Sequence, residues 1–299
     1  MLIVHGGAGV RNTPYSEERK ARVRAALAQA LEAGMVVLDA GGEAIDAVVA
    51  AVHVMEDCPE FNSAHGAALT RDGRAELDSC LMKGDGSVGS VAGTTTARNP
   101  IDAARAVMEK TPHVLVAAPR PEQLASWGVE QVDNAYFVTE YRKQQLAELL
   151  AHEAAQEADA ELDDERHGTI GVVARDAAGN LCAGTSTGGI TDQIPGRIGD
   201  APICGCGTYA NQATCAVSCT GTGEKFIQEV AGYQVHARML WGGEEAGAAV
   251  KDVLEAVTAR GGDGGIICVP AHGEGVVART WDAEMNWAYA YGEVRETHS

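Results

Sequence analysis

HGTIGVVARDAAGNLCAGTSTGG, residues 167–189, reads as two apolar strands joined by a turn. The first strand opens at Thr169, directly after Gly168, and an acidic, alanine-rich run over 154–166 precedes it. That run holds too few large apolar side chains to form a packed core, so it is expected to be a linker or a disordered segment. A glycine and a threonine placed at this junction, in mid-chain, raise the question of what the junction does.

Groups of strands and helices lie on both sides of this hairpin. The residues 16–34 begin with a serine cap and end at a glycine, which is typical of a helix, and 43–57 has an almost continuous apolar face. Further helices are predicted near 100–110, 120–127, 139–153, 222–241 and 245–260, and strands near 1–5, 87–95, 201–206, 213–219, 264–269, 273–279 and 286–291. Neither side of the junction closes a core alone, so we predict one domain with sheet layers inside and helices outside.

The composition excludes several classes of partner. The chain has 299 residues and a formal net charge of −19, which would repel nucleic acid and anionic membrane surfaces. The N-terminal MLIVHGGAG resembles a strand rather than a targeting segment, and no run of about 18 apolar residues could span a bilayer. We therefore expect a cytoplasmic protein with a small-molecule substrate and with its 8 cysteines reduced.

Four of these cysteines allow a second interpretation, a structural zinc module. Cys204 and Cys206 alternate on a predicted strand, and Cys215 and Cys219 share a face of the next one. The spacing lacks the usual C-x2-C knuckle, and no histidine lies near. Small buried apolar side chains are the favoured interpretation of these residues.

Thr169 itself has an ordinary interpretation as a β-branched strand residue. Its context favours another one. If the bond between Gly168 and Thr169 were cut, the threonine would carry a free α-amine, whose unperturbed pKa of about 7.7 to 8.0 makes it a base near neutral pH. A hydroxyl activated by its own amine is a known form of nucleophile. The same hydroxyl could attack the carbonyl of Gly168 and make the cut.

Two further segments could complete such a site. SCTGTGE, residues 218–224, offers the Thr220 hydroxyl and the Gly221 N–H as donors to an oxyanion, although helix capping would also explain it. PGRIGD, residues 195–200, places Arg197 and Asp200 in a glycine-rich turn. An arginine binds a carboxylate and an aspartate accepts from an ammonium, so the pair could hold an α-amino acid, or simply form a surface ion pair.

Five motifs occur together in a recognisable order. They are HGGAG at 5–9, CPEFNSAHGAALTRDGRAELDSC at 58–80, the hairpin at 167–189, PGRIGDAPICGCGTYA at 195–210 and SCTGTGE at 218–224. This set strongly resembles the plant-type asparaginase/isoaspartyl peptidase family of N-terminal nucleophile hydrolases, to which the glycosylasparaginases are related. Several ordered motifs spread over nearly the whole chain are far more specific than one glycine pattern.

The resemblance implies an α+β fold, an αββα four-layer sandwich of the N-terminal nucleophile hydrolase type. It also implies that the single domain, residues 1–299, cuts itself between Gly168 and Thr169. The α chain would be residues 1–168, with a flexible linker over about 154–168, and the β chain residues 169–299. Two such αβ units would form a dimer.

The resemblance also assigns roles. Thr169 would be the nucleophile, Thr187 its hydrogen-bond partner, Thr220 and Gly221 the oxyanion donors, and Asn62 a supporting residue. Arg197 would bind the substrate α-carboxylate and Asp200 its α-amine. The full substrate-binding set is Arg197, Ile198, Gly199, Asp200, Thr220, Gly221, Thr222 and Gly223.

Catalysis of this kind needs no cofactor. The family does hold a sodium ion in a loop through backbone carbonyls, and backbone oxygens suit a hard cation. In this sequence the corresponding residues are Met55, Glu56, Cys58, Phe61, Ser63 and His65.

The expected activity is hydrolysis of L-asparagine to L-aspartate and ammonia, and removal of β-aspartyl residues from peptides. Two alternatives stay open besides the zinc module. One is a glycosylasparaginase-type hydrolase, against which the missing secretory segment argues. The other is an uncleaved amino-acid-binding protein that uses Arg197 and Asp200 without chemistry.

Overall fold

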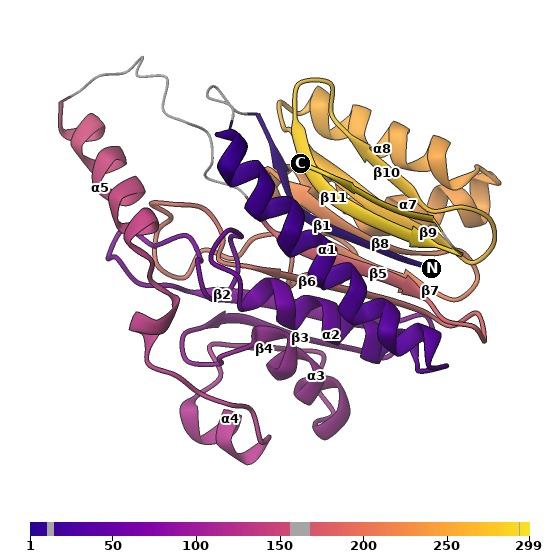
Figure 1. Cartoon of the computed structure of the whole chain (residues 1–299), viewed down its shortest axis with the longest axis horizontal. Coiled ribbons are helices and arrows are strands. Elements are labelled where there is room, and N and C mark those ends of the chain that lie inside the picture. Colours follow the sequence, from indigo (N-terminus) through magenta and orange to yellow (C-terminus); the bar gives the residue numbers. More distant parts are fainter. Residues whose placement is uncertain (11–14, 156–167, 293) are drawn as a thin grey trace.

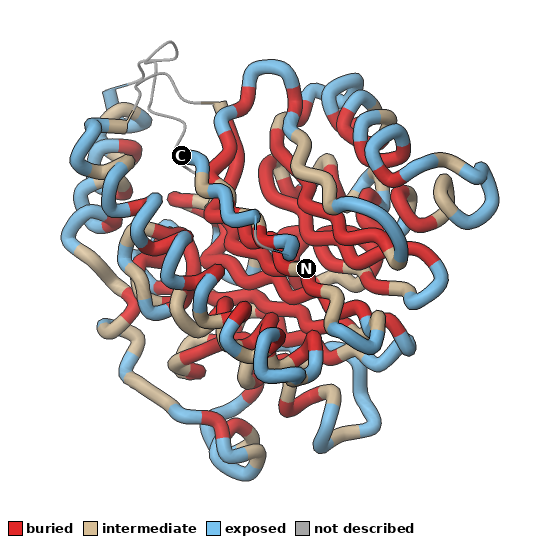
Figure 2. The backbone as a smooth tube through the Cα atoms, turned by 45° about the vertical axis from the view of Figure 1, so that its right-hand side comes forward, coloured by how far each residue is buried: buried red, intermediate tan, exposed pale blue. Residues whose placement is uncertain are grey.

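The computed structural model describes residues 1–10, 15–155, 168–292 and 294–299. Two β-sheets stack face to face, and helices cover the outer face of each, which confirms the four-layer αββα arrangement (Figure 1). The central strands of both sheets are buried, the edge strands are partly exposed, and the helices expose their outer surfaces (Figure 2). Most of the predicted linker, residues 156–167, lies outside the described residues.

The larger sheet holds eight strands within the described residues, in the order β12-β11-β1-β5-β6-β2-β3-β4. Neighbours are antiparallel except for the parallel pair β3 and β4. The strands are β1 (Leu2–Gly9), β2 (Leu77–Lys83), β3 (Val88–Thr94), β4 (Leu115–Ala117), β5 (Ile170–Arg175), β6 (Leu181–Thr187), β11 (Glu284–Tyr291) and β12 (Val294–His298). The hairpin of residues 167–189 thus supplies β5 and β6 at the centre of this sheet.

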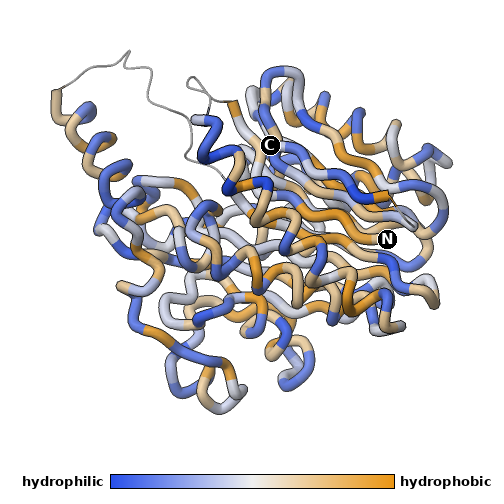
Figure 3. The backbone as a smooth tube through the Cα atoms, in the orientation of Figure 1, coloured by the Kyte–Doolittle hydropathy of each residue, from blue (hydrophilic) through white to orange (hydrophobic). Residues whose placement is uncertain are grey.

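The smaller sheet holds four antiparallel strands of the described chain in the order β10-β9-β8-β7. They are β7 (Thr208–Asn211), β8 (Cys215–Gly221), β9 (Gly264–Pro270) and β10 (Val276–Arg279). Apolar side chains from both sheets, among them Ile3, Val173 and Ile267, fill the space between them. Strands buried on both faces read as continuous apolar runs, and Figure 3 shows such runs in the interior of the molecule.

Helices α1 (Glu17–Asp39), α2 (Ala44–Glu56) and α3 (Pro100–Lys110) cover the outer face of the larger sheet. The short helices α4 (Pro121–Ser126) and η1 (Asn134–Phe137) and the helix α5 (Glu140–Ala154) follow at its periphery (Figure 1). The Ser16 hydroxyl caps α1, as the sequence predicted, by accepting from the Arg19 N–H. The buried faces of α1 and α2 form one apolar core with β1, β5 and β6.

The helices α6 (Gly223–Glu229), α7 (Ala231–Gly242) and α8 (Ala246–Ala259) cover the smaller sheet. Cys215, Cys219 and Cys268 are buried in the apolar core beneath α7 and α8. All eight cysteines lie in the described ranges and are free. Cys204, by contrast, packs at the edge of the core between the sheets, so the four cysteines of the zinc interpretation are divided between two places.

Two local predictions were wrong. Residues 201–206 are not a strand: the chain turns there, and the Gly207 N–H closes the turn on the Asp200 carbonyl at 3.0 Å. The predicted helix over 222–241 is two helices, α6 and α7, separated by Val230. Val230 adopts a left-handed conformation, with φ of 50° and ψ of 48°, which ends one helix and redirects the chain into the next.

No helix of the described residues is long and apolar enough to cross a membrane.

Replacing Val230 with glycine is expected to stabilise the protein. A left-handed conformation costs an L-residue about 1–2 kcal/mol, and more for a β-branched one, whereas glycine adopts it freely. The larger entropy of an unfolded glycine offsets about 0.5–1 kcal/mol of that gain. We expect Tm to rise by about 2 °C in a thermal melt. The control is Gln228→Gly, an exposed position inside α6, which should lower Tm; a fall of Tm in V230G as well would contradict the strain argument.

Candidate active site

The predicted nucleophile lies where β5 begins and β6 ends. In the antiparallel pair, Ile170 is opposite Ser186, so the residue before the one strand, Thr169, falls beside the last residue of the other, Thr187. The Thr169 Oγ1 donates a hydrogen bond to Thr187 Oγ1 at 3.0 Å, and both side chains are buried. The hairpin register therefore produces the predicted pair of threonine hydroxyls.

Thr187 is itself held in place by the turn that follows β6. Its Oγ1 accepts the Gly189 N–H at 3.0 Å. Asn62 fixes the same turn: its Nδ2 donates to the Gly189 carbonyl at 2.7 Å, and its main-chain carbonyl accepts the Gly188 N–H at 3.1 Å. The Asn62 Oδ1 in turn accepts the Ala68 N–H at 2.7 Å. Asn62 thus holds the turn that follows Thr187 and makes no hydrogen bond to the Thr169 hydroxyl in the structure.

The Gly168 backbone is tightly enclosed. A side chain on Gly7, whose φ is +106°, would come within 2.7 Å of the Gly168 Cα, and one on Gly168 would come within 3.0 Å of the Asn62 Cβ. Only glycine fits at Gly7, because neither its conformation nor the space admits a Cβ. The HGGAG motif therefore lets β1 approach the predicted scissile bond closely.

The predicted oxyanion donors lie at the end of β8, against the same part of β1. The Ala8 N–H donates to the Thr220 Oγ1 at 3.3 Å, which leaves the hydroxyl proton of Thr220 available to another acceptor. Gly221 has a φ of +136°, and a Cβ there would lie 2.2 Å from the Asp263 carbonyl oxygen. Both residues are buried, and Ala8, which bonds Thr220, follows Gly7, whose backbone lies against Gly168. They meet the requirement for donors fixed before the charge develops.

Arg197 is not an isolated surface charge. Its Nε and Nη2 each lie 3.0 Å from a different carboxylate oxygen of Glu224, in a two-pronged pair. The Nη1 reaches the Gln193 Oε1 at 3.5 Å. One edge of the guanidinium is thus occupied by Glu224, and the donors of Nη1 point elsewhere. A substrate carboxylate would be bound by this remaining part of the group.

Asp200 is a buried neighbour of Arg197. Its side chain is 4% exposed, and its Oδ2 has no hydrogen-bond partner among the described residues. Burial raises the pKa of this carboxyl to about 7, against an opposing effect of Arg197. A Cβ on Gly223 would lie 2.8 Å from the Asp200 Oδ1 and 3.1 Å from the Arg197 Nη2, so the glycine keeps open the space between the two. A buried, unpartnered carboxylate oxygen is suited to an incoming ammonium group.

The amino-acid sequence can be compared with those of known proteins. The sequence pattern of the asparaginase family matches residues 1–298. The chain belongs to this family. It is 44% identical to an isoaspartyl peptidase of Salmonella typhimurium over 97% of this chain and 95% of that protein, and 43% identical to the isoaspartyl peptidase of Escherichia coli over 97% and 93%. An isoaspartyl peptidase/L-asparaginase of Mus musculus is 39% identical over 96% of this chain and 87% of that protein.

The asparaginase family comprises hydrolases of the N-terminal nucleophile class, so this chain is a hydrolase with that fold. The segments that the sequence singled out approach one another: β5 packs against β8, and Gly223, after the end of β8, lies against Arg197 and Asp200 in the turn before β7. Of the other residues in the predicted substrate set, Gly199 is buried and donates its N–H to Asp78, Ile198 is exposed, and the Thr222 hydroxyl donates to Asp263.

Sequence reasoning missed Asp78. It lies in β2 opposite Thr187, and its carboxylate accepts the N–H groups of Gly93 at 2.8 Å and Gly199 at 3.4 Å. Burial raises the pKa of Asp78 to about 6. The side chain thus ties the turn of residues 195–200 to β2, the neighbour of β6, which carries Thr187. Its signal in the sequence was one acid inside a buried strand, which carries a charge only if partners satisfy it.

The loop predicted to hold sodium fits a cation in part. Phe61, Ser63 and Ala64 are buried, and Ala64 has a φ of 41°, so the loop is tightly turned. Three of the six predicted carbonyls accept backbone hydrogen bonds, those of Met55, Glu56 and Cys58, and each keeps a second lone pair. The buried Oε2 of Glu56 has no hydrogen-bond partner among the described residues. Burial raises the pKa of Glu56 to about 8, so its carboxyl is neutral near pH 7, and the candidate ligands for a hard cation are the backbone carbonyls of this loop.

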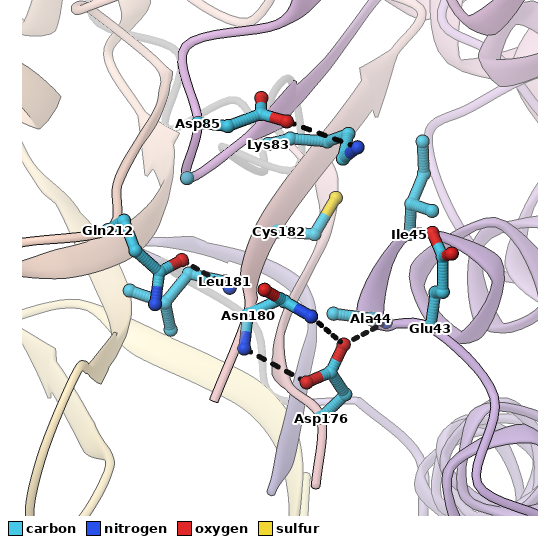
Figure 4. Close-up of a pocket in the computed structure, with 11 residues that line it drawn as sticks. Glu43, Ala44, Ile45, Lys83, Asp85, Asp176, Asn180, Leu181, Cys182 and Gln212 are labelled. Atoms are coloured by element: carbon cyan, nitrogen blue, oxygen red, sulfur yellow. Dashed lines mark hydrogen bonds and ion pairs between the residues drawn. The ribbon is translucent and has the colours of Figure 1, made fainter. Parts of the chain in front are cut away.

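A separate pocket of about 250 Å³ lies at the other end of β5 and β6 (Figure 4). Lys83 and Asp85 pair across it at 3.2 Å, and Asp176 accepts the Ala44 N–H at the start of α2. None of the described residues that line it belongs to the predicted site. Asn180 also pairs with Asp176 in this pocket, at 3.0 Å between its Nδ2 and the Asp176 Oδ2.

Glu224→Gln tests the contact to Arg197. The neutral amide keeps the shape but weakens the two charge-assisted bonds, so the guanidinium should be less firmly oriented. We expect KM for an asparagine-type substrate to rise about tenfold, with kcat within about twofold, which corresponds to about 1.4 kcal/mol of lost binding. Glu255→Gln, which disturbs a remote surface pair with Lys251, serves as control. An unchanged KM in E224Q would show that Arg197 needs no such support.

Proposed function

We propose that this hydrolase cuts itself before Thr169 and then hydrolyses the side-chain amide of L-asparagine and the β-aspartyl bond of isoaspartyl peptides. One observation carries the proposal. The Thr169 hydroxyl is bound to Thr187, Thr187 lies opposite Asp78, and Asp78 accepts the Gly199 N–H. Gly199 belongs to the turn whose Arg197 and unpartnered Asp200 Oδ2 offer the two charges that an α-amino acid requires. The names of the relatives support the same two substrate classes.

Self-cleavage would begin with attack of the Thr169 Oγ on the Gly168 carbonyl carbon. The peptide bond breaks, its nitrogen takes the hydroxyl proton, and an ester joins Gly168 to the threonine oxygen. Water then hydrolyses the ester, which leaves a carboxylate on Gly168 and a free α-amine on Thr169. The close contact of Gly168 with Gly7 and Asn62 supports a fixed orientation of this bond.

Substrate hydrolysis would use the same oxygen. The Thr169 Oγ attacks the β-carbonyl while the threonine α-amine accepts its proton, and the oxyanion takes donors from Thr220 and Gly221. The leaving ammonia or amino acid receives that proton, and a β-aspartyl ester remains on the enzyme. Water, deprotonated by the same amine, hydrolyses the ester to release aspartate. Arg197 and Asp200 hold the α-carboxylate and the α-ammonium throughout.

Three further properties belong to this proposal. The loop of Met55, Glu56, Cys58, Phe61, Ser63 and His65 would bind sodium, which when bound would brace the loop that carries Asn62. Two αβ units would associate as a dimer, and no nucleic acid or membrane partner is required. A cytoplasmic location agrees with eight free cysteines, which a reducing compartment maintains.

The test combines a denaturing gel with a substrate panel. The purified 31.1 kDa protein should give two bands, residues 1–168 and 169–299, and should release product from L-asparagine and from β-aspartyl-leucine. A glycosylated asparagine should be a poor substrate. A single uncut band without activity would favour the binding-protein alternative, and preference for the glycosylated substrate would favour a glycosylasparaginase.

A further inference from the structure

A hydrogen-bonded bridge joins the end of β1 to the end of β8, beside the candidate oxyanion donors. At its centre is Asp263, the residue directly before β9. The Asp263 Oδ2 accepts the Val10 N–H at 3.0 Å, and the Oδ1 accepts the Thr222 hydroxyl at 2.5 Å. Each carboxylate oxygen thus holds one donor, and the two donors come from segments far apart in the chain. The carboxylate of Asp263 is therefore the link between these two segments.

The main chain of Asp263 holds the β8 end as well. Its carbonyl oxygen accepts the Thr222 N–H at 2.9 Å, and its N–H donates to the Thr222 Oγ1 at 3.3 Å. The single hydroxyl proton of Thr222 goes to the carboxylate while the hydroxyl oxygen accepts, so all of these bonds can form together. Gly221 packs on the same carbonyl, because a Cβ there would lie 2.2 Å from the Asp263 oxygen. The contacts of Asp263 therefore hold Gly221 and Thr222 in place.

The other end of the bridge lies on the segment that encloses the predicted scissile bond. Val10 follows directly after β1, and β1 contains Gly7, where a Cβ would come within 2.7 Å of the Gly168 Cα. Gly168 directly precedes the nucleophile. By holding Val10, Asp263 thus ties the segment that packs against Gly168 to the segment that carries the oxyanion donors. The spacing between nucleophile and donors depends on such ties.

Helix capping does not explain the Thr222 side chain. A threonine at the N-cap usually stabilises a helix by accepting an N–H of the first turn. Thr222 is the N-cap residue of α6, but its side chain makes no capping hydrogen bond. Its hydroxyl bonds the Asp263 carboxylate instead. The side chain therefore serves the bridge and not the start of the helix.

We propose that Asp263 is a positioning residue, which keeps the oxyanion donors of Thr220 and Gly221 aligned with the nucleophile. This inference rests on the proposed function and names a further determinant of it. Asp263 acts through Thr222 and Val10 and not on the reacting atoms. An oxyanion donor is most effective when its position is fixed before the charge develops. Loss of the bridge should therefore slow the chemical step and leave substrate binding by the turn of residues 195–200 intact.

Asp263→Ala removes both carboxylate bonds. We expect kcat for L-asparagine to fall about tenfold with KM within about twofold, because displaced donors stabilise the transition state less and the ground state equally. The dissociation constant of L-aspartate, measured by calorimetry, should also stay within about twofold. The matched control is Asp176→Ala, at the other end of β5 and β6, where Oδ1 accepts the Asn180 N–H at 2.9 Å and Oδ2 the Ala44 N–H at 3.2 Å. It should lower Tm comparably and leave kcat unchanged.

Thr222→Val tests the bridge without a change of charge. Valine keeps the β-branched shape and removes only the hydroxyl, and no helix cap is lost with it. We expect kcat to fall about fivefold with KM unchanged. The double variant T222V/D263A should match D263A within about twofold, because the hydroxyl acts through the carboxylate.

Wild-type activity and the denaturing gel are read first. An inactive wild type would contradict the proposed function and this inference together. With an active wild type, a kcat in D263A equal to that of D176A would overturn the inference alone. So would a loss confined to KM, a matching loss of L-aspartate affinity, or additive effects in the double variant. If D263A does not fold or is not cut, T222V decides, and a wild-type kcat in T222V would overturn the inference.

Discussion

Thr169→Ala is expected to remain a single band on a denaturing gel and to release no measurable ammonia from L-asparagine. The only change is loss of the hydroxyl and its methyl, at a buried position where the Oγ1 donates to Thr187 at 3.0 Å. Without that oxygen neither the Gly168 carbonyl nor the substrate carbonyl has its nucleophile. We expect activity to fall by at least about 10⁴-fold, as for other enzymes that lose a covalent nucleophile.

Thr169→Ser is the matched control, because it keeps the hydroxyl and removes only the methyl group. We expect the T169S chain to be cut, more slowly than the wild type, since a serine side chain is less restricted in rotation than a β-branched one. Time courses on gels measure both rates. Two bands from T169A would mean that another group cuts the chain, and the proposed mechanism would then be wrong.

The fold was largely predictable where apolar periodicity and end signals agreed. The helix from Glu17, begun by the Ser16 cap, and the buried strands of the 167–189 hairpin follow from local chemistry. The break at Val230 was not predictable, because valine disfavours the left-handed conformation that it adopts there. Tertiary contacts override that preference. They also convert the apolar run at 201–206 into a turn, where the Gly207 N–H finds the Asp200 carbonyl.

The candidate site was predictable only in part for a related reason. Thr169, Thr187 and Thr220 belong to contiguous motifs, and a motif can be read along the chain. The residues that hold this site together come from distant segments: Asp78 reaches Gly199, and Asn62 reaches Gly189, across 121 and 127 positions. An acid in a strand or an asparagine in a loop gives no sign of which partner satisfies it. That information lies in strand register, which the sequence pattern alone did not determine.

Asp200→Asn is expected to raise KM for L-asparagine about 100-fold while leaving the fold intact. The carboxylate is the buried group suited to the substrate ammonium, and an amide offers no opposite charge to it. Loss of one charged, buried contact costs about 3 kcal/mol, which is about two orders of magnitude in affinity. Asp176→Asn, at the pocket beyond the far ends of β5 and β6, is the control and should leave KM unchanged.

The pH dependence of kcat/KM tests the same role of Asp200. Burial raises the pKa of Asp200 to about 7, so the carboxyl is neutral below that pH and charged above it. We therefore expect kcat/KM of the wild type to rise as pH increases through about 7, and this limb of the profile should be absent in D200N. The α-amine of Thr169 titrates as well, but it remains in both proteins, so the difference between their profiles reports Asp200.

The contribution of Asp200 to the free energy of unfolding should fall as pH increases, whereas kcat/KM should rise. Because its folded pKa lies above the unfolded value of about 3.9, Asp200 binds a proton in the folded state between these two pH values that the unfolded state releases. Its contribution to stability is present at low pH and is lost as pH rises through about 7. D200N avoids this loss, so its Tm should exceed that of the wild type at pH 8 and match it near pH 4. A Tm of D200N below the wild-type value at pH 8 would mean that Asp200 already has a partner in the free enzyme, and that it is no open site for an ammonium group.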